Sequence, residues 1–276
     1  MKWYRKAAEQ GHAEAQNSLG IRYKNGQGVR KDFTEAVRWY RKAAEQGHAD
    51  AQNSLGFRYK NGEGVRKDYA EAAKWYKKAA QQEHASAQYN LGVNYEIGEG
   101  VRQDYSEAVK WYKKAAEQGN KFAQNNLGFL LQAGLGVRKD YSQAARWFRE
   151  AAEQGHTDAQ NNMGFLFATG QGVGEDDTEA VKWYRKAAEQ GNRAAQNNLG
   201  FSYETGQGVL KDYGQAVKWY RKAAEQGHAD AQNNLGLMYE KGRGIRKDYS
   251  EARRWYRKAV KQGNSGAKKN LRRLEK

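Results

Sequence analysis

The tryptophans of this chain lie at one constant interval. Each stands 36 residues after the previous one, at Trp3, Trp39, Trp75, Trp111, Trp147, Trp183, Trp219 and Trp255. The flanking sequence returns with the same period, without an insertion or a deletion, so the chain is a tandem repeat. A continuous repeat of this length predicts a linear array of similar units, each of which packs mainly on its neighbours.

The segment 32–47, DFTEAVRWYRKAAEQG, predicts an amphipathic helix, which we call helix B. Its apolar residues recur at helical spacing, while Arg and Lys occupy the other side. Asp32 and Glu35 are typical of a capping box, in which both side chains bind free backbone amides at the helix start. Gly47 is typical of a helix end with a left-handed backbone. In the next repeat Glu83 replaces this glycine, which predicts either local strain or a different cap.

A second helix, called helix A, is predicted before each full helix B, as in residues 13–25, AEAQNSLGIRYKN. Gly20 returns in the middle of every full copy, although glycine costs about 1 kcal/mol there. We therefore expect a bulky ring, that of the helix-B tryptophan, to press on the backbone at this point. Helix A has Ala15, Leu19 and Tyr23 on one side and a further apolar position at Ile21, so it is expected to pack on both flanks. The equivalents of Ile21 are Phe57, Val93, Phe129, Phe165, Phe201 and Leu237.

These patterns predict an all-α chain of about 16 helices. We expect one domain over residues 1–276, with an N-terminal capping half-repeat that holds a lone helix B at 1–12. Seven full repeats cover 13–264, and a capping helix of mostly polar residues covers 265–276. Each repeat alone could not bury its apolar stripe, so the core must be shared between neighbours.

Composition excludes several classes of protein. With no cysteine, the chain has neither disulfides nor thiolate metal ligands. It contains no apolar run of about 18 residues that could span a membrane and no signal peptide, so a soluble protein without membrane insertion is expected. Because the sequence starts inside a helix B, its compartment stays open between cytoplasm, periplasm and secretion. A monomer is expected.

The consensus AQxxLGxxYxxGxGVxxDYxxAxxWYxxAAxQG resembles the Sel1-like repeat, a relative of the tetratricopeptide repeat, over essentially the whole chain. The resemblance implies an α-solenoid, a right-handed superhelix of antiparallel helix pairs with helix A on the concave side. It also implies a protein-interaction scaffold and not an enzyme. The cysteine-bridged branch of the family is excluded. Proline, frequent in the family, is replaced here by Arg30, Arg66, Arg102, Arg138, Gly174, Leu210 and Arg246.

Residues that could suggest chemistry all repeat with the scaffold. The five histidines share one repeat position with three asparagines: His12, His48, His84, His156 and His228, with Asn120, Asn192 and Asn264. A catalytic site does not recur in this way, so a structural role at the repeat junction is predicted. The GxG pairs follow helices and lack GK[ST], which indicates turns and not a phosphate loop. We expect no catalytic residue, cofactor or metal.

Positive charge is concentrated on one kind of segment. The net charge is +16, of which the seven helix-A segments with their glycine loops contribute −1 and the seven helix-B segments +11. Residues 245–276 alone carry +9. A solvated basic face explains this pattern. A polyanion such as nucleic acid is a less favoured partner, for which the candidate residues are Arg253, Arg254, Arg257 and Lys258.

A protein or peptide partner is favoured, held by helix A in the concave groove. The helix-A positions that vary most between copies are not required to hold the fold together, and they are therefore the predicted contacts with a partner. Repeats four and five place apolar residues at these positions, which predicts an exposed apolar patch with anchors at Leu130 and Leu166. The predicted partner-binding residues are Arg22, Arg58, Asn94, Leu130, Leu135, Leu166, Ala168, Ser202 and Met238. A purely structural, consensus-like array is the remaining alternative.

Overall fold

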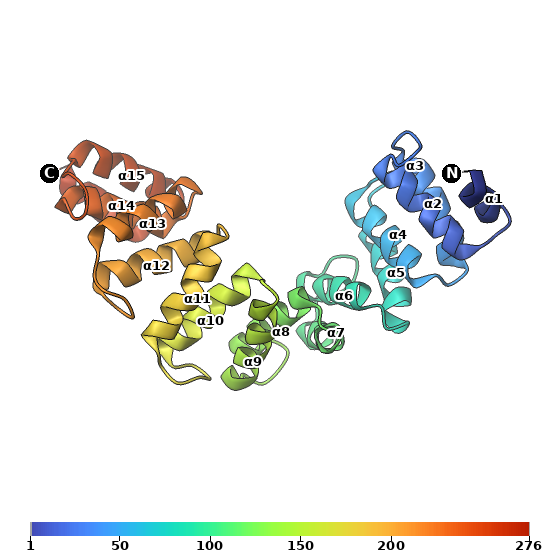
Figure 1. Cartoon of the computed structure of the whole chain (residues 1–276), viewed down its shortest axis with the longest axis horizontal. Helices are drawn as coiled ribbons and strands as arrows, with labels where there is room; N and C mark the ends of the chain where they lie inside the picture. The colour runs from blue at the N-terminus through green and yellow to red at the C-terminus, as the bar shows by residue number, and fades with distance from the viewer. Residues whose placement is uncertain (1, 276) are drawn as a thin grey trace. The chain divides into compact units, whose positions relative to one another are not determined.

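The structure, a computed structural model, describes residues 2–275 and contains sixteen α-helices and no strand in that range (Figure 1). The helices are α1 (Lys2–Glu9), α2 (Ala13–Asn25), α3 (Phe33–Glu45), α4 (Ala49–Asn61), α5 (Tyr69–Gln81), α6 (Ala85–Ile97), α7 (Tyr105–Glu117), α8 (Lys121–Ala133), α9 (Tyr141–Glu153), α10 (Thr157–Thr169), α11 (Asp177–Glu189), α12 (Arg193–Thr205), α13 (Tyr213–Glu225), α14 (Ala229–Lys241), α15 (Tyr249–Lys261) and α16 (Ser265–Leu274). Odd numbers are helices B and even numbers are helices A. The predicted all-α repeat fold is confirmed.

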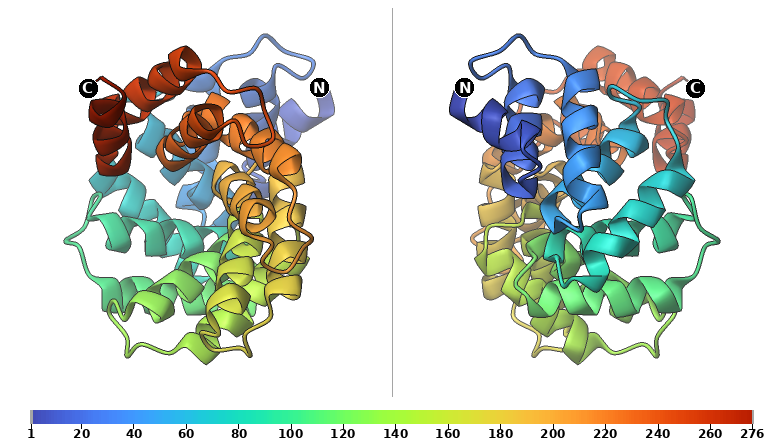
Figure 2. Two further views of the ribbon diagram at one scale, coloured as in Figure 1. Left: turned by 90° about the vertical axis from the view of Figure 1, so that its left-hand side faces the viewer. Right: turned by 90° about the vertical axis from the view of Figure 1, so that its right-hand side faces the viewer.

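Two compact units divide the helices. Unit 1 covers residues 1–140 with α1 to α8, and unit 2 covers residues 141–276 with α9 to α16. Within each unit, each helix packs on its neighbours in the sequence (Figure 2). Each unit is therefore a stack of helix pairs in which contacts join sequence neighbours, as expected of a solenoid. No described helix is long and apolar enough to cross a membrane.

The core of each repeat is built from small alanines of helix B and one large ring. Tyr40 is buried, and a Cβ added to Gly20 would lie 2.7 Å from its ring carbons. The equivalent glycine and tyrosine are in contact in other repeats, as in Gly56–Tyr76 and Gly200–Tyr220. The expectation that tryptophan presses on this glycine is wrong. The tryptophan lies one position earlier on helix B, about 100° around the helix axis, and packs on the neighbouring repeat instead.

The helix-B starts follow the predicted cap only in part. The carboxylate of Asp32 accepts hydrogen bonds from the backbone amides of Thr34 (2.8 Å) and Glu35 (3.1 Å). The reciprocal bond of a capping box is not formed, because the amide of Asp32 already donates to the carbonyl of Tyr23. The carboxylate of Glu35 instead pairs with Arg38 at 3.3 Å. The loop before helix B thus meets helix A through the backbone, which leaves the second acid free to pair along its own helix.

The helix ends agree with the sequence. Gly47 has a φ of 95°, in the left-handed region. Glu83, its equivalent in the next repeat, is the only described non-glycine residue with a positive φ, at 62°. The predicted strain at Glu83 is therefore present as a backbone conformation that an L-residue with a Cβ adopts at a cost.

Candidate protein-binding surface

The predicted contact residues of helix A lie mostly inside the units. Leu130 and Leu166 are both 0% exposed, so the predicted exposed apolar patch is wrong. Each follows a buried core residue by three positions, Leu127 and Met163, and at that spacing side chains lie on the same side of a helix. Variation between the copies therefore reflects tolerance of different side chains in the core and not exposure to a partner.

None of the other predicted contact residues listed above is fully exposed either. Asn94, Ser202, Met238 and Arg58 are buried, while Arg22, Leu135 and Ala168 are half-buried. Ala168 packs against the core of unit 2. Because these four side chains are buried, a partner that approaches from solvent cannot contact them first.

The surface of helix A carries a different set of apolar side chains, each directly before one of the predicted contact residues in the sequence. Phe165 on α10 is 41% exposed and Phe201 on α12 is 48% exposed, and Leu237 on α14 is half-buried. Unit 1 repeats the arrangement with exposed Ile21, Phe57 and Phe129. Helix A packs on both flanks as expected, but its apolar position at Ile21 and the equivalents remains at least partly exposed. We call Phe165, Phe201 and Leu237 the apolar row of unit 2.

Asparagine side chains join successive helices A of unit 2 beside this row. The Nδ2 of Asn198 donates to Oδ1 of Asn161 (3.0 Å), that of Asn234 to Asn197 (3.1 Å), and that of Asn270 to Asn233 (2.9 Å). We call these six residues the asparagine ladder. Asn161 precedes Phe165 by four positions, as Asn197 precedes Phe201, so ladder and row lie on the same face of each helix.

The ladder amides keep hydrogen-bonding capacity after they have bonded to each other. An asparagine side chain offers two donors and an acceptor with two lone pairs, and the ladder bond uses only one donor or one lone pair of each partner. All six residues are only half-buried, so water or a ligand reaches the remaining groups. Asparagine is also a poor helix former, and two adjacent copies per helix therefore need a reason beyond helix stability.

In unit 1 the ladder is interrupted by an aromatic residue. Asn90 still donates to Asn53 (3.0 Å), but Tyr89 replaces the first asparagine of α6. Its ring lies 5.9 Å from those of Tyr112 and Phe122. The asparagine pairs are visible in the sequence, but only the structure shows that they join neighbouring helices.

Four of the five histidines cap the following helix A, as the predicted structural role at the repeat junction requires, whereas His12 makes no side-chain cap bond. Nδ1 of His48 accepts from the amide of Ala51 (3.4 Å) and its Nε2 lies 2.8 Å from Glu14 of the preceding helix A. Asn192 reproduces both contacts, to the amide of Ala195 and to Asp158. Burial lowers the pKa of His228, which favours the neutral ring as a cap. No group of three or more potential metal ligands occurs among the described residues.

The candidate polyanion-binding residues all have partners within the chain. Arg253 donates to the carbonyl of Leu274 (3.2 Å), and Arg254 pairs with Glu251 (3.0 Å). Arg257 pairs with Glu275 (3.4 Å), and the Nζ of Lys258 lies 4.0 Å from the centre of the Trp255 ring. Arg253 and Arg257 thus join α15 to the end of α16, whereas Arg254 and Lys258 interact within α15.

The sequence matches the Sel1 repeat at residues 1–12 and then in seven consecutive 36-residue segments, 13–48, 49–84, 85–120, 121–156, 157–192, 193–228 and 229–264. The chain belongs to the Sel1 repeat family. Sel1 repeat proteins are generally protein-interaction scaffolds. No curated protein matches the chain.

Solved structures of Sel1 repeat proteins share the fold. A protective antigen of uropathogenic Escherichia coli with an SLR fold is 44% identical, with a TM-score of 0.89 over 99% of this chain and 58% of that one. The present chain thus spans less than two thirds of that relative. A Sel1 repeat protein from Oxalobacter formigenes is 38% identical, with a TM-score of 0.79 over 99% of this chain and 79% of that one. Yeast Tom70, 16% identical with a TM-score of 0.51 over 99% of this chain and 57% of its own, shows the fold alone.

Proposed function

We propose that the chain is a non-enzymatic scaffold and that unit 2 binds an extended segment of a partner protein along α10, α12, α14 and α16. The observation that carries this proposal is the asparagine ladder beside the apolar row. Both belong to the helix-A face, which the family resemblance assigns to the partner.

The chemistry of the ladder fits a peptide main chain. Peptide groups alternate donors and acceptors, and an amide side chain supplies both. A helical ligand has its own peptide groups already paired, so it would leave the ladder amides unused. An extended ligand keeps these groups available and turns alternate side chains to one side. Phe165 and Phe201 are then placed to receive apolar side chains of the ligand, since exposed aromatic residues are frequent interface anchors.

The proposal is tested with immobilised peptides of varied sequence, followed by solution binding of the best one. Replacing both Phe165 and Phe201 by Ser should weaken binding at least about tenfold, because two aromatic anchors are lost. The control replaces Phe57, equally exposed in unit 1, by Ser and should leave binding unchanged. Both variants should stay close to the parent melting temperature, since the replaced side chains are exposed.

A second arm examines the main chain of the ligand. N-methylation of alternate peptide amides removes donors while it keeps the side chains, and it should weaken binding if the ladder accepts from the peptide backbone. Full binding by both methylated series, or by the double serine variant, would contradict the extended-peptide proposal. A ligand that binds only in helical form would contradict it as well.

A polyanion is the second candidate, and helix B provides a specific observation for it. On α13, Lys218, Arg221 and Lys222 line an open pocket of about 440 Å³ together with Val217, Ile245 and one acid, Glu225. Arg221 donates to the neutral hydroxyl of Tyr239 and Lys222 lies over the Trp219 ring, so the pocket lining has three cations and one carboxylate. If binding persists in the serine variant but falls steeply as salt rises, the polyanion function replaces the peptide function.

A further inference from the structure

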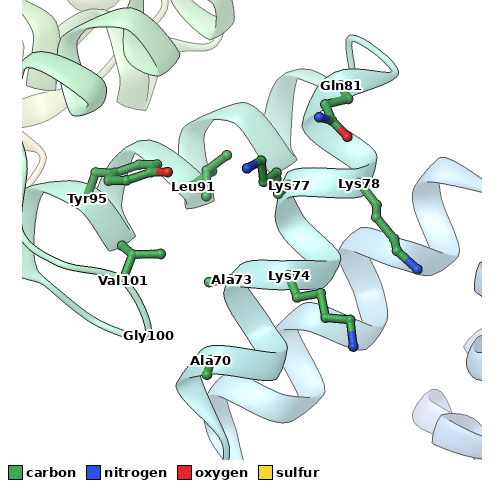
Figure 3. A pocket seen from close by; sticks show the side chains of 10 residues that line it. All are labelled: Ala70, Ala73, Lys74, Lys77, Lys78, Gln81, Leu91, Tyr95, Gly100 and Val101. Atoms are coloured by element: carbon green, nitrogen blue, oxygen red, sulfur yellow. The ribbon is translucent and has the colours of Figure 1, made fainter.

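An open pocket of about 350 Å³ lies in unit 1 between α5, α6 and the loop that follows α6 (Figure 3). Its apolar lining comes from Ala70 and Ala73 of α5, Leu91 of α6, and Val101 of the loop. The volume is near the lower end of the range in which proteins bind small molecules. Two sister pockets occupy the equivalent place beside α3 and α13, so they serve as internal references.

The pocket on α5 reaches the following helix A, which its sisters do not, although its volume is the smallest of the three. Ala73 stands where the sister pockets have Val37 and Val217. Only beside Ala73 do the leucine and tyrosine of the following helix A, Leu91 and Tyr95, form part of the lining. The two missing methyl groups thus open a path to the side of α6.

A second substitution leaves two polar side chains of this pocket without the hydrogen bond that joins their equivalents in the sister pockets. In the sister pockets Arg41 and Arg221 donate to the hydroxyls of Tyr59 (2.7 Å) and Tyr239 (3.0 Å). In the pocket on α5 the residues are Lys77 and Tyr95, and no such bond joins them in the described part of the chain. Figure 3 shows the amine of Lys77 and the hydroxyl of Tyr95 turned toward one another across Leu91.

The other two lysines of the pocket face elsewhere. Lys74 pairs with Glu71 at 3.1 Å, and Lys78 lies 4.2 Å from the centre of the Trp75 ring. In Figure 3 both side chains point away from Leu91 and Tyr95. Beside its apolar floor the pocket therefore offers one cation, the exposed Lys77, and one hydroxyl donor, Tyr95, and the amide of Gln81 completes its polar lining.

We propose that this pocket binds a small organic carboxylate with an apolar body. One carboxylate oxygen would accept from the amine of Lys77 and the other from the hydroxyl of Tyr95, while the body rests on Ala73 and Leu91. A carboxylate has one charge and two acceptor oxygens, which matches the two donors. A phosphate dianion would need more donors, and an amine would meet Lys77 with like charge. The site lies in unit 1 between α5, α6 and the loop after α6, so it shares no residue with the proposed peptide-binding face of unit 2.

The test uses phenylacetate as the probe, with phenylethylamine and phenylethanol as its cationic and neutral counterparts. Amide resonances of residues 70–101 should shift saturably with phenylacetate and not with the amine, and phenylethanol should bind more weakly. Ala73→Val, which restores the sister residue, should weaken phenylacetate binding at least about tenfold by filling the floor. Lys77→Gln should weaken it at least about fivefold, because a charge-assisted hydrogen bond is lost.

A gain of function gives the matched control. Val217→Ala with Arg221→Lys builds the same pair of residues into the sister pocket on α13 and should create a second phenylacetate site there. A tripeptide that ends in phenylalanine with a free carboxylate is tested as well. If it binds tighter than phenylacetate, the carboxylate site is supported and its natural ligand is the C-terminus of a peptide. No saturable shift, equal shifts with the amine, or unchanged binding by Ala73→Val would overturn the proposal.

Discussion

Asn94 places a whole amide side chain in the core of unit 1. It is 1% exposed, and neither its Nδ2 nor its Oδ1 has a hydrogen-bond partner among residues 2–275. The equivalent residues in the next two repeats are Leu130 and Leu166, also buried. A buried polar group without a partner is destabilising, whereas a leucine of similar volume fits an apolar site.

We predict that Asn94→Leu stabilises unit 1 by about 1–3 kcal/mol, the range for relieving an unpaired buried polar group. Chemical denaturation of the parent and the variant, followed by circular dichroism, measures the change. The reverse substitution at the equivalent position, Leu166→Asn, should destabilise the protein. A lower denaturation midpoint for Asn94→Leu would show that the amide is paired in solution and that its burial carries no such penalty.

At the scale of the helix, the C-terminal end of α5 differs from its equivalents. Glu83 holds a φ of 62°, where Gly47 and Gly119 hold 95° and 83°. A Cβ added to Gly47 would meet no atom within 4 Å. The cost at Glu83 therefore belongs to the backbone conformation and not to a steric clash with neighbours.

We predict that Glu83→Gly raises stability by about 0.5–1 kcal/mol, since relief of the left-handed strain exceeds the greater entropy of glycine in the unfolded chain. The midpoint of thermal unfolding gives the measurement. Gly119→Glu is the matched control and should lower the midpoint by a similar amount. Equal midpoints for Glu83→Gly and its parent would mean that some contact of the glutamate offsets the strain.

The helices themselves were largely predictable from sequence, whereas the exposed face of helix A was not. Asp32 and Gly47 act locally, so their residue types sufficed to predict where helix B starts and ends. Leu166 and Phe165 are adjacent apolar residues about 100° apart on one helix. Which of them faces solvent depends on the helices packed around α10, and the local pattern does not contain that information.

The partner of the helix-A glycine could not be predicted either, for a similar reason. Tryptophan and tyrosine stand side by side on helix B, and both rings are large enough to require a glycine opposite. The crossing of the two helices decides that Tyr40 meets Gly20 and that Trp39 packs on the neighbouring repeat. Likewise, the asparagine ladder depends on contact between residues 37 apart, which sequence spacing alone does not indicate.

Across the whole molecule, one buried phenol recurs from repeat to repeat. It belongs to the tyrosine that follows the helix-B tryptophan, in unit 1 and in unit 2 alike. The pKa of each of these hydroxyls is raised, with burial as the largest cause, and the residues are Tyr40, Tyr76, Tyr112, Tyr184, Tyr220 and Tyr256. For Tyr40 the raised pKa is about 12, although Arg58 lowers it. Phe148 takes this place in α9.

These phenols predict a loss of stability in alkali. An unfolded tyrosine releases its proton near its ordinary pKa of about 10, while the folded one still holds it. Between that pH and the raised folded pKa, the folded state binds more protons than the unfolded state, so stability falls as pH rises. Below about pH 9 both states are protonated and these groups contribute no pH dependence.

We therefore predict that these tyrosines leave the free energy of unfolding unchanged up to about pH 9. Above that pH the free energy of unfolding should decline, by up to about 1.4 kcal/mol per pH unit for each tyrosine in the unit that unfolds. Urea titrations between pH 8 and pH 11, with the ultraviolet absorbance of the phenolate as a second probe, measure the decline. Tyr40→Phe should make it shallower, because one titrating group is removed while the ring remains as in Phe148. Phe148→Tyr should make it steeper in unit 2. If Tyr40→Phe leaves the alkaline slope unchanged, burial of this phenol does not couple its proton to folding.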